Sequence, residues 1–202
     1  MNLGQTMLSA ATLVVLAALV LNANRLIIEG EKDIVRGETF DLAVNYAQAL
    51  LTEIARKKFD ANSKDSVYQA PSEFTSPSSL GPNSTERSAV WGSHNHDPSG
   101  EKLLRYDLPP EERGECPAAD QSPFKSIAAF DDADDYHGYE RVIDTNVIQN
   151  LRLTVEVYYV KDSSPDSKVS TQTYFKRVTV YAHQSTYLNP HNPIAFSTLV
   201  TN

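Results

Sequence analysis

The chain has 202 residues and a formal net charge of −8, with 18 Lys and Arg against 26 Asp and Glu. This length provides for one domain of ordinary size with a real core in addition to an N-terminal helix. The acidic balance argues against nucleic acid or an anionic lipid surface as the main partner, because both attract Lys and Arg clusters. Cys116 is the single Cys and has no intrachain disulfide partner, so packing must hold the fold together.

The N-terminal region contains the one uncharged apolar run of the chain, from Met7 to Leu21. Such a run is a secretion signal, a membrane anchor or an assembly helix. Residues 1–6 have no Lys or Arg, which argues against a cleavable secretory signal. As a helix the run spans about 22 Å, short of the roughly 30 Å hydrocarbon core of a bilayer. Its expected assembly residues are Met7, Leu8, Leu13, Val14, Val15, Leu16, Ala17, Ala18, Leu19, Val20 and Leu21.

Helical spacing of apolar residues continues beyond this run to Lys58, through Ile34, Phe40, Leu50 and Ile54. The pattern predicts one long helix, with a kink between Asn22 and Glu31. Lipid or other copies of the chain must bury its first half. The second half carries a stripe suited to packing on a sheet.

The remaining chain is expected to contain irregular loops followed by strands. Residues 60–101 and 108–123 are rich in Pro and polar residues and are predicted to be loops. Alternating patterns predict strands at 151–160, 174–183 and 194–201, with 161–172 as a hairpin connection. The expected fold class is α+β, with a long hydrophobic helix at 1–58 packed on an antiparallel sheet in a globular domain at 59–202.

Several short motifs carry a family resemblance. Gly4 to Leu8, the apolar run, and the stretches 47–54 and 58–60 resemble the N-terminal region of type IV pilins and pseudopilins. The segments 80–82, 130–139 and 175–180 are similar to minor pilins of the mannose-sensitive haemagglutinin pilus type. The resemblance implies a subunit that is inserted in the inner membrane, processed between Gly4 and Gln5, and polymerised into a filament with a core of bundled helices.

The sequence departs from the family pattern at one important position. Family members usually have a glutamate five residues after the processing glycine, where this chain has Ser9. That carboxylate is thought to neutralise a neighbouring subunit's N-terminal amine in the apolar core, where an unpaired charge is costly. If cleavage follows Gly4, the side chain of Gln5 can cyclise onto its own amine and remove the charge.

Three polar groups are candidate binding or modification sites. Asp131, Asp132, Asp134 and Asp135 could hold calcium, although hydrogen bonds that brace a turn are the simpler interpretation. His94 and His96 lack the further spaced ligands that zinc requires. Asn83 begins a glycosylation acceptor pattern in a predicted loop. Apart from possible calcium, no cofactor is expected.

These patterns favour a structural protein over an enzyme, because no nucleophile, carboxylate pair or phosphate-binding loop has a recognisable context. The expected function is a pilin-like subunit that polymerises with itself in an extracellular filament. Its partners would be other copies, the inner membrane before assembly and the pilus assembly machinery, without nucleic acid. The alternatives are a membrane-anchored periplasmic binding module and a pseudopilin of a type II secretion-like system.

Overall fold

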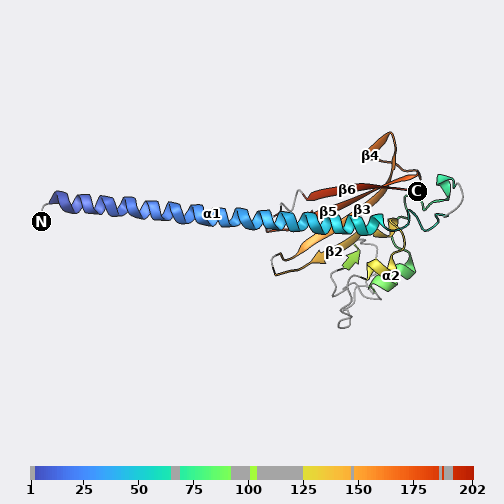
Figure 1. Ribbon diagram of the computed structural model, residues 1–202, viewed down its shortest axis with the longest axis horizontal. Helices are drawn as coiled ribbons and strands as arrows, with labels where there is room; N and C mark the ends of the chain where they lie inside the picture. Colours follow the sequence, from blue (N-terminus) through green and yellow to red (C-terminus); the bar gives the residue numbers. More distant parts are fainter. Residues whose placement is uncertain are drawn as a thin grey trace. The chain divides into compact units, whose positions relative to one another are not determined.

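The computed structural model describes residues 3–64, 69–91, 101–103, 125–146, 148–186, 188 and 193–202 (Figure 1). The expected α+β architecture is confirmed: a long N-terminal hydrophobic helix packs through its C-terminal part against an antiparallel sheet. In chain order the elements are α1 (Leu3–Ala55), η1 (Pro71–Glu73), α2 (Ser84–Trp91), β1 (Glu101–Leu103), α3 (Ser126–Ala129), η3 (Asp134–Tyr136), β2 (Tyr139–Ile143), β3 (Leu151–Lys161), β4 (Ser164–Lys168), β5 (Phe175–His183) and β6 (Ile194–Thr201).

Helix α1 has 53 residues and is helical throughout, including residues 22–31 where a kink was expected. Ala and Leu dominate its first part and favour helix, and Gly30 and Gly37 do not interrupt it. It ends at Ala55, three residues before the expected end at Lys58. The chain divides into two compact units, residues 1–41 and 42–202, so the last part of α1 belongs to the packed unit.

A stripe of apolar side chains packs the last part of α1 against the rest of the packed unit. Ala43, Ala47, Leu50 and Ile54 recur at helical spacing and have no exposed surface. The small side chains of Ala43 and Ala47 let the helix backbone approach the sheet, whereas Leu50 and Ile54 fill the space nearer its end. Leu50 and Ile54 belong to the stripe that the sequence predicted, whereas Ile34 and Phe40 of that prediction are 64% and 44% exposed and Ala43 was not part of it.

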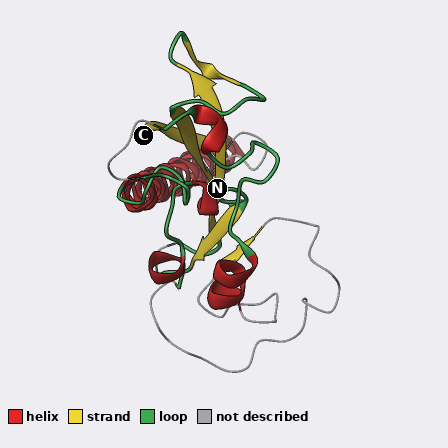
Figure 2. Ribbon diagram, turned by 90° about the vertical axis from the view of Figure 1, so that its right-hand side faces the viewer, coloured by secondary structure: helices red, strands yellow, loops and turns green. Residues whose placement is uncertain are grey.

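The strands, yellow in Figure 2, form a single antiparallel sheet. Their order is β1-β2-β3-β5-β6, with β4 paired to β3. Strand β3 alternates strictly at its start: Leu151, Leu153, Val155 and Val157 are buried, and the residues between them are exposed or half-buried. Neighbouring strands continue this inner face, with Val157 opposite Val178 and Val180 opposite Phe196. One face therefore forms the core with α1.

The predicted strands at 151–160, 174–183 and 194–201 correspond to β3, β5 and β6. The predicted loops were wrong in part, because residues 60–101 contain η1, α2 and the start of β1, and the 161–172 connection contains β4. Helix α2 begins with a capping box in which Asn83 Oδ1 accepts from the Thr85 and Glu86 N–H groups while Glu86 accepts from the Asn83 N–H. The sequence did not predict strand β2, because buried charged residues interrupt the alternation of apolar and polar side chains that marks a strand.

Candidate functional site

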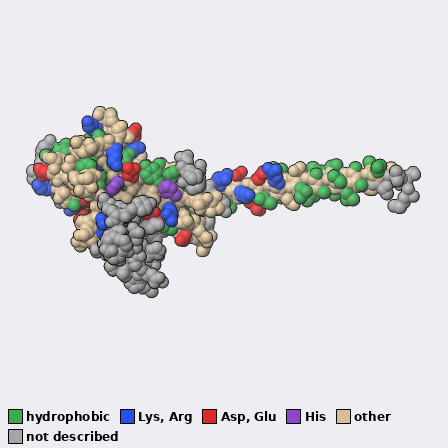
Figure 3. Space-filling view, turned by 180° about the vertical axis from the view of Figure 1, so that it is seen from behind, with side chains coloured by type: hydrophobic (Ala, Val, Ile, Leu, Met, Phe, Trp, Pro, Cys, Tyr) green, Lys and Arg blue, Asp and Glu red, His purple; other side chains and the backbone are tan. Residues whose placement is uncertain are grey.

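The first part of α1 presents an apolar surface that no described residue of its own compact unit covers. Met7, Leu13, Val14 and Leu21 are between 66% and 70% exposed, and Val20 is 51% exposed. The same surface appears as the green stretch of helix in Figure 3. The helix is long and apolar enough to cross a membrane by length and composition. We call Met7–Leu21 the apolar segment.

A charged stretch of the same helix follows the apolar segment. Arg25 and Glu29 form an ion pair at 2.8 Å, and Asp33 and Arg36 form one at 3.4 Å. These groups are solvent-exposed, so each pair contributes little stability and the stretch is suited to water rather than to hydrocarbon. The boundary near Arg25 therefore separates an apolar part of α1 from a solvated one.

The expected processing residues lie at the start of α1. Gly4 is helical and exposed, and a side chain added there would meet nothing within 4 Å. The backbone of Gln5 is helical, but its side chain lies outside what the structure describes. Ser9, at the position of the family glutamate, is exposed.

The acidic turn, Asp131 to Asp135, is braced by its own carboxylates. Asp132 Oδ1 accepts from the backbone N–H groups of Asp134 and Asp135 at 2.8 and 3.1 Å. Asp135 Oδ2 accepts from the N–H groups of Asp131 and Asp132 at 2.9 and 3.1 Å. Such bonds satisfy donors that the turn would otherwise bury without partners. Burial, reinforced by the charge of Asp134, raises the pKa of Asp132 to about 9. Burial also raises the pKa of Asp135 to about 7.

Asp134 has a different partner, a fully buried lysine on β5. Lys176 Nζ donates to Asp134 Oδ1 at 2.6 Å, to Asp60 Oδ2 at 2.8 Å and to the Phe59 carbonyl at 2.7 Å. Burial alone would raise the pKa of Asp60, but the hydrogen bond and charge of Lys176, with the N–H groups of Thr75 and Asn62, lower it below its ordinary value. We call Lys176, Asp60 and Asp134 the lysine cluster.

The carboxylates that converge on one point are not the four that the sequence suggested. Oxygens of Glu86, Asp131 and Asp135 lie within 4.8 Å of one another, an arrangement compatible with a hard cation such as calcium. Asp132 and Asp134 are instead directed to the turn backbone and to Lys176. Sequence reasoning missed Glu86, whose place is set by the capping box of α2. The N-S-T-E order at 83–86 was the available signal.

A second buried polar group joins α1 to the sheet. Arg141 on β2 donates from both terminal nitrogens to Glu53, each at 3.0 Å, and Tyr136 Oη donates to Glu53 at 2.6 Å. Arg141 Nε also donates to the Tyr139 hydroxyl, and that hydroxyl donates to Glu101 at 2.8 Å. Burial raises the pKa values of Tyr139 and Glu101. This network was not predicted, because its members are far apart in sequence.

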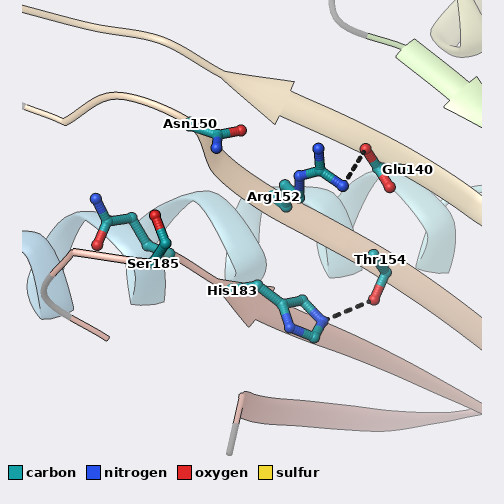
Figure 4. Close-up of a pocket in the computed structure, with 7 residues that line it drawn as sticks. Glu140, Asn150, Arg152, Thr154, His183 and Ser185 are labelled. Carbon is teal, nitrogen blue, oxygen red and sulfur yellow. Dashed lines mark hydrogen bonds and ion pairs between the residues drawn. The ribbon is translucent and has the colours of Figure 1, made fainter. Parts of the chain in front are cut away.

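The outer face of the sheet carries a pocket of about 420 Å³ (Figure 4). Across its floor, Arg152 lies 3.6 Å from Glu140, and Thr154 lies within hydrogen-bonding distance of His183 at 3.2 Å. Burial, with the charge of Arg152, lowers the pKa of His183, so its ring is neutral near pH 7. The pocket is lined by Glu140, Asn150, Arg152, Thr154, His183, Gln184 and Ser185.

The remaining candidates from the sequence fall in two groups. Asn83 is exposed and caps α2 through its oxygen, which leaves the amide nitrogen, where a glycan would attach, on the exposed side chain. His94, His96 and Cys116 lie outside the described residues.

No protein-family model, curated protein or solved structure matches the chain. The architecture itself is pilin-like: a long apolar N-terminal helix whose later part packs on an antiparallel sheet.

Proposed function

We propose that this protein is a structural subunit of an extracellular type IV pilus-like filament, assembled through the apolar segment. The observation that carries the proposal is that this segment is exposed on a helix whose far end is anchored in a folded unit. Exposed apolar area of this extent requires cover in water, from lipid or from the same segment of other copies.

The arrangement of small and large side chains supports packing between helices. Ser9, Ala10, Ala11, Ala17 and Ala18 stand between bulkier Leu and Val residues. Because lipid tails and Leu side chains are similarly apolar, transfer of the helix from lipid to a helical bundle gives little hydrophobic gain. Close packing at the small residues must therefore make the bundle more favourable than the lipid. Before assembly, the same segment would hold the subunit in the inner membrane, where the assembly machinery would meet it.

The decisive experiment separates membrane insertion from assembly. We expect Ala17→Phe and Ala18→Phe to insert into membranes normally but to form few or no filaments, because added bulk disrupts packing without opposing partition into lipid. Ala55→Phe, at the exposed last residue of α1, is the matched control and should assemble normally. Electron microscopy of surface filaments and membrane fractionation give the two readouts. Normal filaments from the bulky variants would favour a simple membrane anchor instead.

A further inference from the structure

Lys176 is fully buried, which is rare for lysine. Its Nζ lies 4.4 Å from the ring centroid of Phe59 and 5.1 Å from that of Tyr159. Two carboxylates, from Asp60 and Asp134, lie within 2.8 Å of it. Keeping one ammonium and two carboxyl groups out of water carries a large desolvation cost. The function proposed above does not use this site.

The two carboxyl groups have different surroundings. Asp60 accepts four further hydrogen bonds, from Asn62 N–H, from the N–H and hydroxyl of Thr75, and from the Tyr159 hydroxyl, at 2.9 to 3.2 Å. These donors stabilise the anion, which is a poor electrophile, and together with Lys176 they lower the pKa of Asp60, so Asp60 can hold a proton from Lys176 only transiently. Among the described residues, the carboxyl group of Asp134 accepts a hydrogen bond from Lys176 alone, so fewer donors stabilise its anion. Asp134 is therefore the better electrophile.

We propose that Lys176 and Asp134 condense spontaneously to form an intramolecular amide bond. Asp60 takes a proton from the Lys176 ammonium, and the free amine attacks Cγ of Asp134. A bond forms between Nζ and Cγ, and one C–O bond of Asp134 breaks. The departing oxygen leaves as water, carrying the second proton from nitrogen and the proton that Asp60 returns. One ammonium and one carboxylate thus become one amide and one water, with no oxidant or other reactant required.

The geometry supplies what this reaction lacks in solution. Lys176 Nζ is held 2.6 Å from Asp134 Oδ1, which replaces a bimolecular encounter by a step within one molecule. The product removes two buried charges, and with them their desolvation cost. The amide N–H that remains can still donate to Asp60. The bond would link η3 to β5 and close a loop between residues 42 positions apart.

Mass spectrometry of the full chain under denaturing conditions tests the proposal. We expect a mass lower than that of the sequence by one water, and a peptide in which Lys176 is joined to Asp134. Trypsin should fail to cleave after Lys176. A mass equal to that of the sequence, or a bond from Lys176 to Asp60, would overturn the proposal.

Variants assign the roles. Asp134→Asn should give the same final mass as the wild-type product, because ammonia leaves in place of water. Asp60→Asn should remain uncondensed while its circular dichroism stays that of a folded chain. Lys57→Arg is the control, since Lys57 donates to the Ile127 and Phe130 carbonyls and should leave the condensation intact. An Asp60→Asn chain that condenses at the wild-type rate would exclude Asp60 as the base.

Discussion

Glu53, near the end of α1, and Arg141, on β2, form a bidentate ion pair with both nitrogen–oxygen distances at 3.0 Å and both side chains largely buried. The pair joins residues 88 positions apart and connects the helix directly to the sheet. Because both groups have lost most of their water, removing one leaves the other charge buried without its principal partner.

We therefore expect Arg141→Met to lower the free energy of unfolding by about 3–5 kcal/mol. Urea unfolding of the purified chain, followed by circular dichroism, measures the change. The control is Arg25→Met, which breaks an exposed pair on the same helix and should cost at most about 1 kcal/mol. Equal effects from the two variants would show that the buried pair does not anchor α1.

A second prediction concerns pH. The pKa of Asp132 is about 9 in the folded chain against an ordinary value of 3.8, so the folded state keeps a proton that the unfolded state releases. The stabilisation from this proton is complete below the unfolded pKa and is lost as pH rises towards about 9. Asp132→Asn mimics the protonated acid, so its melting temperature should rise relative to wild type between pH 5 and about 9. Asp33→Asn, on the exposed part of α1, is the control, and a pH-independent difference for Asp132→Asn would contradict the assignment.

A third prediction concerns calcium. If Glu86, Asp131 and Asp135 bind the ion, calcium should raise the melting temperature and chelator should lower it, because an ion bound only by the folded state adds stability by mass action. Asp131 is exposed, so Asp131→Asn should remove the calcium response without disturbing the core. An identical transition in calcium and in chelator would leave the acidic turn with a hydrogen-bonding role alone.

The fourth prediction concerns independence of the two compact units. Deletion of residues 1–28 should release a soluble, folded monomer, because the buried hydrophobic core begins at Ala43 among the described residues. Gel filtration and circular dichroism measure size and folding. The matched control is a deletion of residues 1–6 alone, which keeps the apolar segment and should remain in the membrane fraction. An unfolded product from the longer deletion would mean that the first half of α1 is needed for folding.

Sequence reasoning was most informative where side chains repeat with a regular period. The stripe of Ala43, Ala47, Leu50 and Ile54 and the alternation along β3 are local patterns that depend only on helix and strand geometry. The lysine cluster has no such pattern, because Asp60 and Lys176 are 116 positions apart and are adjacent only after folding. Strand β2 was missed for a related reason: Glu140 and Arg141 read as surface residues, yet both are buried.

The same uninterrupted helix carries both the apolar segment and the buried stripe. Tension applied along α1 would therefore act as a shear force between the helix and the sheet. That force would be shared at the same time by the contacts of Ala43, Ala47, Leu50 and Ile54. Their contacts, together with the Glu53–Arg141 pair, would have to fail at nearly the same time rather than one after another. A junction built in this way resists pulling better than a domain tethered by a loop, whose contacts can peel off singly.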